Sequence, residues 1–96
     1  MTKQDLIRNI AIKTGQSQND VSAIVDAFMS TINASMAAGE RVVLTGFGTF
    51  DLSRRQAREA RNPATGEAMQ IPAKTFPRFS PGKHLKDAAA SAPIDA

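Results

Sequence analysis

The chain has 96 residues and carries twelve lysine and arginine side chains against nine aspartates and glutamates, for a formal net charge of +3. This length predicts one domain, near the lower limit at which a single core is stable alone, so a partner chain is expected. With no cysteine and one histidine, a disulfide framework, a thiolate metal site and a histidine cluster are excluded, and no cofactor is expected. No apolar stretch has the length of a signal-peptide core or a membrane span, which predicts a cytoplasmic protein that does not bind membranes.

Two amphipathic helices are predicted at the start of the chain. Thr2 followed by Asp5 resembles a capping box with aspartate in place of glutamate, and the apolar stripe after it ends at Gly15. Ser17 repeats the start signal, and a longer stripe at helical spacing runs to Gly39. The residues of this second stripe are Val21, Ile24, Val25, Phe28, Met29, Ile32 and Met36. Two such helices have more apolar surface than they can bury against each other, and a second copy of the chain would cover the excess.

A sheet is predicted next. Residues 41–44 and 49–52 have the composition of strands, and they flank the tripeptide Gly46-Phe47-Gly48. A bend between these glycines could present backbone amides to a phosphate, which makes Gly46 a candidate contact. An ordinary hairpin turn is the alternative.

The chain returns to this sheet through residues that restrict where the returning strand can lie. Pro72 and Pro77 each lack an amide donor, which confines that strand to a sheet edge. A short helix is predicted over residues 83–90, and a disordered tail over residues 91–96.

Between these two parts, residues 53–74 form a strand-like segment with no apolar face, interrupted by Asn62-Pro63-Ala64-Thr65-Gly66. A strand period of two distributes its arginines over both faces. One face would carry Arg54 and Arg58, and the other Arg55 and Arg61. Because an isolated two-stranded ribbon is marginal in water, a long one with arginines and a proline turn at its tip is interpreted as an arm that binds a polyanion.

The positive charge is concentrated in the same region. Residues 53–86 contain eight basic and two acidic side chains, a balance of +6, whereas residues 1–52 contain four basic and five acidic ones, a balance of −1. The eight cations are Arg54, Arg55, Arg58, Arg61, Lys74, Arg78, Lys83 and Lys86. Clustered positive charge is typical of nucleic-acid binding, although a basic solvated surface without a specific partner is an alternative.

Two other functional classes have less support. An enzyme would need a nucleophile with a base, a carboxylate pair or spaced metal ligands, and the acids here are scattered. The phenylalanines could be stacking platforms for RNA or single strands. However, Phe28 lies on a helix stripe and Phe50 alternates with polar neighbours, which favours core packing for both. Phe76 receives no assignment, and His84 is expected on a helix surface.

Three motifs occur in a fixed order along the chain. They are Gly46-Phe47-Gly48-Thr49-Phe50, then Arg58 before Arg61-Asn62-Pro63-Ala64-Thr65-Gly66-Glu67, then Pro81-Gly82-Lys83 before Leu85-Lys86. With the two-helix start, they make residues 1–90 resemble the bacterial histone-like HU and integration host factor family, and HU more closely. Ala60 stands where members of that family often carry glycine.

The resemblance implies an α+β fold with two N-terminal helices, a three-stranded antiparallel sheet with an extended β-ribbon arm, and a short C-terminal helix. It implies an intertwined homodimer, or a heterodimer with a paralogous subunit. The HU-like DNA-binding domain would consist of a helical dimerisation base (residues 1–39), the sheet and arm (residues 40–80) and the C-terminal helix (residues 83–90). The implied dimer core consists of Phe28, Ile32, Leu44, Phe47, Phe50 and Phe79.

The family's mode of binding places the arms in the minor groove of duplex DNA, where the proline at the tip, here Pro63, inserts between base pairs and kinks the duplex. From the residues alone, Pro63 could simply shape a turn. The candidate DNA contacts are Lys3, Gly46, Arg54, Arg55, Arg58, Arg61, Asn62, Pro63, Lys74, Arg78, Lys83 and Lys86.

The function implied by the resemblance is that of a non-enzymatic, histone-like architectural protein. Such a protein binds duplex DNA with little sequence preference, bends it, and organises and compacts the bacterial nucleoid, without a small-molecule substrate. A sequence-selective bender of the integration host factor type and an RNA or single-strand binder are the alternatives.

Overall fold

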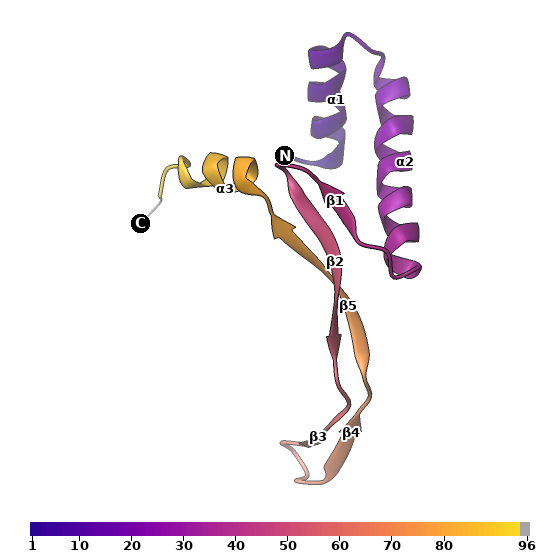
Figure 1. Ribbon diagram of the computed structural model, residues 1–96, viewed down its shortest axis with the longest axis vertical. Coiled ribbons are helices and arrows are strands. Elements are labelled where there is room, and N and C mark those ends of the chain that lie inside the picture. The colour runs from indigo at the N-terminus through magenta and orange to yellow at the C-terminus, as the bar shows by residue number, and fades with distance from the viewer. Residues whose placement is uncertain (95–96) are drawn as a thin grey trace.

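The computed structural model describes residues 1–94 of the chain, which form the α+β architecture predicted from the sequence (Figure 1). Two N-terminal helices lie beside a three-stranded antiparallel sheet, and a long ribbon leaves this sheet and ends in a two-stranded tip. The elements are α1 (Lys3–Thr14), α2 (Gln18–Ala37), β1 (Val42–Leu44), β2 (Gly48–Arg55), β3 (Arg58–Arg61), β4 (Ala68–Ile71), β5 (Lys74–Pro81) and α3 (Lys83–Ala90).

The predicted start signals of both long helices are confirmed. At α1 the Asp5 amide donates to the Thr2 hydroxyl at 3.2 Å and the Thr2 amide donates to the Asp5 carboxylate at 3.0 Å, which completes a capping box. The Ser17 hydroxyl accepts from the Asp20 amide at 3.1 Å and caps α2 in the same way. These caps satisfy backbone donors that would otherwise lack a partner in the first turn of each helix.

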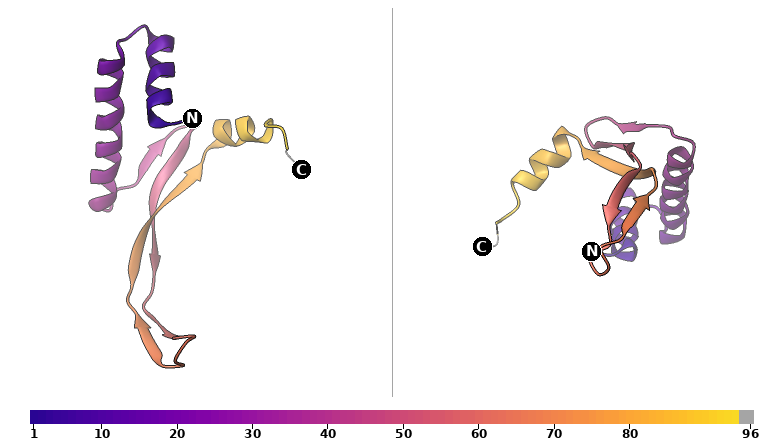
Figure 2. Two further views of the ribbon diagram at one scale, coloured as in Figure 1. Left: turned by 180° about the vertical axis from the view of Figure 1, so that it is seen from behind. Right: turned by 90° about the horizontal axis from the view of Figure 1, so that it is seen from below.

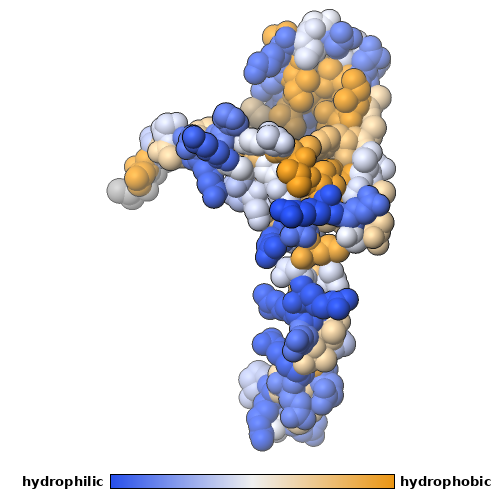
Figure 3. All heavy atoms as spheres, viewed as in Figure 1, coloured by the Kyte–Doolittle hydropathy of each residue, from blue (hydrophilic) through white to orange (hydrophobic). Residues whose placement is uncertain are grey.

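The core of the single chain is small. Its buried apolar residues are Ile7 and Ala11 of α1 and Val21 of α2, with the partly buried Ile10 and Val25 packed against them. The radius of gyration is 19.3 Å, compared with about 13 Å for a compact domain of this length. Hydrophobic side chains also reach the surface over the helices and where these meet the sheet, while the arm is mostly hydrophilic (Figure 3). The chain alone therefore leaves much of its apolar surface in contact with water.

In the three-stranded sheet the strand order is β1-β2-β5, with both pairs antiparallel. β2 and β5 pair over eight residues, from Gly48 opposite Pro81 to Arg55 opposite Lys74. β5 lies at an edge, as its proline predicts, and Pro77 pairs with Leu52 on one side only.

The two faces of the β2–β5 ribbon differ in polarity. One face carries Phe50 and Phe79, whose ring centroids are 4.9 Å apart, and Phe50 shares a shallow depression with Phe28 and Ile32 of α2. The other face carries the register pairs Asp51–Arg78, Ser53–Phe76 and Arg55–Lys74. The apolar face is therefore turned toward the helices, and the polar face is turned away from them.

The ribbon is interrupted a second time, between its base and its tip, in addition to the predicted interruption at the turn of residues 62–66. β3 and β4 form a separate two-stranded sheet, from Arg58 opposite Ile71 to Arg61 opposite Ala68. On one strand Gln56 and Ala57, and on the other Pro72 and Ala73, lie outside both ladders. Proline has no amide to donate, which is one physical reason why the pairing stops here.

The third helix covers the residues predicted for it and extends away from the α1–α2 hairpin (Figure 2). It starts against the turn after β1, where the Gly82 amide donates to the Phe47 carbonyl at 2.8 Å. Of the predicted disordered tail, residues 95–96 lie outside the described range. Among residues 1–94, no helix combines the length and apolarity needed to cross a bilayer.

Candidate nucleic-acid interface

The tip of the arm is a tight turn that presents Pro63 to solvent. The Asn62 side-chain oxygen accepts from the Ala64 amide at 2.9 Å, and the Asn62 carbonyl accepts from the Gly66 amide at 2.7 Å. These bonds hold the chain on both sides of Pro63, which is itself exposed. The half-buried Asn62 side chain thus shapes the turn, and Pro63 is left as a rigid apolar group at the end of a polar arm.

Arg61 lies directly beside this turn. One of its guanidinium nitrogens donates to the Gly66 carbonyl at 3.3 Å, and the remaining donors of the exposed side chain are available to a ligand. A cation next to the exposed proline suits a ligand that offers an apolar surface close to a negative charge.

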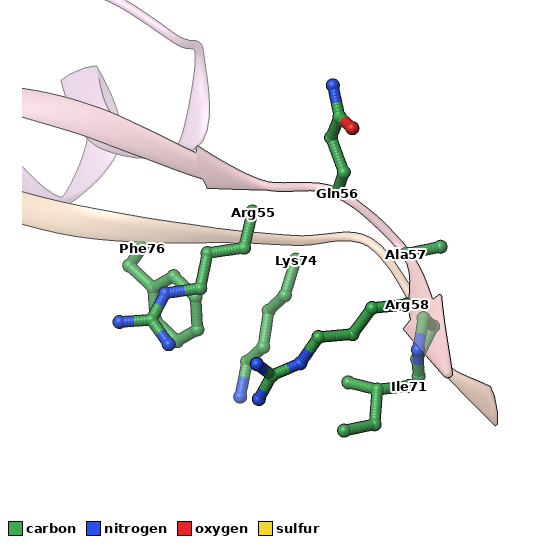
Figure 4. Close-up of a pocket in the computed structure, with 8 residues that line it drawn as sticks. Arg55, Gln56, Ala57, Arg58, Ile71, Lys74 and Phe76 are labelled. Atoms are coloured by element: carbon green, nitrogen blue, oxygen red, sulfur yellow. The ribbon is translucent and has the colours of Figure 1, made fainter. Parts of the chain in front are cut away.

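Farther down the arm, the interruption between the two sheets forms a recess of about 610 Å³ (Figure 4). Its lining residues are Arg55, Gln56, Ala57, Arg58, Ile71, Pro72, Lys74 and Phe76. The side chains of Arg55, Arg58 and Lys74 extend from the same side of the ribbon, whereas Gln56 points to the other side. We call this site the elbow recess.

The elbow recess corrects one prediction. The strand period placed Arg55 and Arg58 on opposite faces of the arm, but the structure brings both to one recess. The period of two holds only within a paired strand. Gln56 and Ala57 are unpaired, so the alternation does not carry across them.

Phe76 occupies the body side of the recess, where sequence reasoning gave it no role. The Arg55 guanidinium carbon lies 5.3 Å from the centroid of its ring, and the Lys74 ammonium lies 5.1 Å from it, within cation–π range. One available signal was that Phe76 follows Lys74 by two residues and therefore shares its face. The aromatic ring holds both cations without neutralising their charge.

Two of the predicted phosphate contacts are paired with carboxylates of the chain itself. Arg78 forms an ion pair with Asp51 at 3.1 Å, and Lys3 forms one with Asp26. The pKa of Asp51 lies below its ordinary value because its carboxylate accepts from the Leu52 amide and, secondly, from Arg78. A phosphate could recruit these cations only in competition with their present partners.

The other predicted cations are more freely presented. Arg54 is exposed and lies opposite Thr75 in the β2–β5 ladder. It is therefore on the other face of the ribbon from Arg55. Lys83 and Lys86 are exposed on the first turn of α3, beside the base of the ribbon. Cations in these positions suit contacts with the phosphate backbone of a nucleic acid that passes across the sheet and along the arm.

Gly46 has a structural role in the turn after β1. Its φ of +83° is in the left-handed region, and its carbonyl accepts from the His84 amide at 3.1 Å. A Cβ atom at this position would lie 2.4 Å from the His84 ring. The neighbouring Phe47 amide donates to the Leu44 carbonyl at 2.9 Å and is not available to a phosphate. These bonds favour the hairpin-turn interpretation, and a DNA contact by Gly46 stays a prediction.

A comparison with known proteins identifies the family. The sequence model described as "Bacterial DNA-binding protein" matches residues 1–90. The chain belongs to this family. It is 51% identical over 86 residues to DNA-binding protein HU of Lactococcus lactis subsp. lactis, covering 90% of this chain and 94% of that protein. It is 46% identical over 87 residues to DNA-binding protein HU of Thermus thermophilus, covering 91% of this chain and 90% of that protein. The resemblance to HU inferred from the sequence motifs is confirmed.

Solved structures of the family have the same fold. A chain of the Anabaena HU–DNA cocrystal structure matches with a TM-score of 0.85 at 38% identity, covering 96% of this chain and all of that one. HU from Thermotoga maritima matches with a TM-score of 0.65 at 31% identity, covering 93% of this chain and 98% of that one. The fold predicted from the resemblance is thereby confirmed for the single chain.

The six residues assigned to the core of an HU-family dimer divide into two groups by their exposure. Phe47, Phe28 and Phe79 expose 49%, 47% and 39% of their surface in the single chain. Ile32, Leu44 and Phe50 are half-buried. Phe79 packs against Gly48, where a Cβ atom would lie 2.4 Å from its ring. The ring centroids of Phe47 and Phe79 are 5.8 Å apart, and the two rings form one apolar surface at the base of the ribbon.

Proposed function

We propose that this chain is a histone-like architectural protein that binds duplex DNA in the minor groove with little sequence preference and bends it. In this role it organises and compacts a bacterial nucleoid and performs no catalysis. The observation that carries the proposal is the arm: a ribbon lined by arginines and a lysine that ends in an exposed proline. Membership of the bacterial DNA-binding protein family and the likeness to HU bound to DNA support it.

The affinity for DNA would come mainly from phosphate contacts. The cations of residues 53–86 outnumber the acids by eight to two, and each cation that neutralises a phosphate releases counterions from the duplex. Lys74, Lys83 and Lys86 are exposed and would contact the phosphate backbone directly. Lys3 and Arg78 would do so after leaving Asp26 and Asp51.

The arm suits the minor groove for electrostatic and geometric reasons. Arginines favour a narrow minor groove, where the negative potential is strongest, and they read little more than A·T content and width. Arg55, Arg58 and Arg61 would line the groove, with Arg54 and Asn62 beside them. Pro63 would act as the wedge between base pairs, for which its rigid ring and exposure are suited.

We further propose that the functional unit is a homodimer. Phe28, Phe47 and Phe79 are too exposed for a stable monomer of this size, and a second copy of the chain would cover them. Ile32 and Phe50 line a shallow depression with Phe28, and Leu44 is the sixth residue expected in this interface. Residues 1–39 would then form the dimerisation base, residues 40–80 the sheet and DNA-binding arm, and residues 83–90 the C-terminal helix. A paralogous chain with the same surface would serve equally well as a partner.

The direct test is energy transfer between dyes at the two ends of a short duplex, titrated with protein and repeated with a duplex of scrambled sequence. A rise in transfer on both duplexes is expected, because the minor groove permits little sequence discrimination. A rise on one duplex alone would replace the proposal with a sequence-selective bender. No rise on either would refute bending and make RNA and single-stranded DNA the next ligands to test.

A further inference from the structure

The elbow recess lies at the junction of two separate sheets. The β2–β5 ladder ends at Arg55 opposite Lys74, and the β3–β4 ladder begins at Arg58 opposite Ile71. The four residues between these pairs form no ladder hydrogen bonds, and one of them is a proline without an amide donor. The backbone pairing therefore does not set the angle between the tip and the body of the arm at this point.

The side chains around this junction carry unbalanced positive charge from both sides of it. Arg55 and Lys74 belong to the body of the arm, and Arg58 belongs to the tip. Within the described part of the chain no carboxylate lines the recess. The ion pairs of the described part of the chain are Lys3–Asp26, Arg8–Asp5 and Arg78–Asp51. None of them involves the three cations of the recess.

We propose that the elbow recess binds one phosphate group between Arg58 on the tip and Arg55 with Lys74 on the body, and that this phosphate sets the angle of the tip. The inference rests on the proposed function, in which a phosphodiester of the bound duplex supplies the group. A free phosphate has the same chemistry, and the experiment below separates the two sources.

The energetic reason is that the bridging anion removes a repulsion and adds contacts that only one geometry satisfies. Three like charges gathered in one recess oppose closure of the elbow when no anion is present. Two guanidinium groups and an ammonium offer the donors that phosphate oxygens prefer, and arginine can bind them through two parallel hydrogen bonds. An anion held from both sides therefore replaces the missing ladder bonds as the connection between the two sheets.

Phe76 makes the recess selective for an anion over an aromatic base. Arg55 and Lys74 both lie over its ring, so the ring is not free for a base to stack on. Its role is to position the two body-side cations, which reach the recess with their charge intact. The ligand expected here is a phosphate group and not a nucleobase.

The experiment measures the distance between two spin labels across the elbow by pulsed electron paramagnetic resonance. The chain has no cysteine, so Asn9→Cys in α1 and Ala68→Cys in β4, both exposed positions, provide a unique label pair. Labelled chain is diluted into unlabelled chain so that a dimer holds at most one labelled copy. The distance distribution is recorded without ligand, with inorganic pyrophosphate and with a short duplex.

The distribution is expected to narrow with the duplex, and Arg58→Gln is expected to abolish this narrowing. If pyrophosphate alone also narrows it, a free phosphate suffices, and Arg58→Gln should weaken that effect by about tenfold, the loss expected for a charged hydrogen-bonding partner. Narrowing with the duplex only, still dependent on Arg58, assigns the phosphate to the bound backbone.

Arg54→Gln is the matched control, because it removes the same charge from the arm at a position on the other face of the ribbon. Since Arg54 is itself a candidate DNA contact, both variants are compared with the duplex at a saturating concentration. Equal loss of narrowing in Arg54→Gln and Arg58→Gln, or narrowing that survives Arg58→Gln, would overturn the inference. So would an unchanged distribution with a duplex that is bound. Failure of the proposed function is a different result, namely no duplex binding and no rise in end-to-end energy transfer with the unsubstituted chain.

Discussion

Asp51 and Arg78 face each other across β2 and β5, and the Arg78 guanidinium donates to the Asp51 carboxylate at 3.1 Å. The pair lies on the face of the ribbon that is turned away from the helices. A cation that the sequence assigned to a phosphate is thus neutralised within the chain. DNA and Asp51 compete for Arg78, and this competition can be tested.

Asp51→Asn is expected to raise the affinity for duplex DNA severalfold at low salt, because it removes a nearby negative charge and releases Arg78. If both copies of Arg78 in a dimer then bind phosphates, the slope of log affinity against log salt becomes steeper by about two. Titration of a labelled duplex at several salt concentrations measures both quantities. Asp20→Asn, in the first turn of α2, is the control, and an equal gain there would show a general charge effect instead.

The stability of the protein is expected to fall in acid through Asp5 and Asp51. The pKa of Asp5 is lowered mainly by the hydrogen bond from the Thr2 amide, and that of Asp51 mainly by the bond from the Leu52 amide. A carboxyl whose pKa is depressed in the folded state contributes stability above its unfolded pKa, and this contribution is lost as the pH falls through the folded pKa. The loss therefore begins near the ordinary value of 3.8 and continues below it. Thermal unfolding from pH 6 downward should show a weaker acid dependence in the double variant Asp5→Asn, Asp51→Asn; an unchanged dependence would contradict this assignment.

Pro63→Ala is expected to retain most of the affinity for a straight duplex and to lose much of the bend. The phosphate contacts come from cations that the substitution leaves in place, whereas the rigid wedge is removed. Binding titrations and end-to-end energy transfer on one duplex separate the two effects. Pro77→Ala, on the helix-facing side of β5, should change neither. Bending by Pro63→Ala equal to that of the unsubstituted chain would remove Pro63 from the mechanism.

The salt dependence of DNA binding should be steep. Each chain carries eight cations in residues 53–86, and if about half of those in a dimer contact phosphates, the slope of log affinity against log salt is roughly −7. Affinity measured over a range of potassium chloride concentrations gives this slope directly. A slope near zero would refute a mainly electrostatic mode of binding.

Phe47→Ala is expected to weaken the dimer by about 3 kcal/mol or more, if its exposed ring is buried by the second chain. The unfolding temperature should then depend more strongly on protein concentration, since folding and association are linked. Sedimentation and thermal unfolding at several concentrations measure this. Phe76→Ala removes an identical side chain from the outer face of the ribbon and should leave the dimer intact. If both variants behave alike, Phe47 is not at the interface.

The sequence by itself determined the elements whose signals are local. The caps at Thr2 and Ser17, the apolar stripes and the turn around Asn62 depend on residues a few positions apart, so the helices and the tip of the arm could be read directly. The polarised charge, which needs no coordinates, indicated a polyanion as the ligand. The family motifs added the overall arrangement of sheet and arm.

Only the tertiary structure decided how the cations are grouped. Arg55 and Arg58 line the same recess. The Phe76 ring makes cation–π contacts with Arg55 and Lys74, and Asp51 forms an ion pair with Arg78. Each of these relationships depends on the cross-strand register or on the point where a ladder stops. A shift of one residue moves a side chain to the other face of a ribbon. Periodicity within one strand contains no information about either quantity, which is why the sequence identified the cations but not the sites they form.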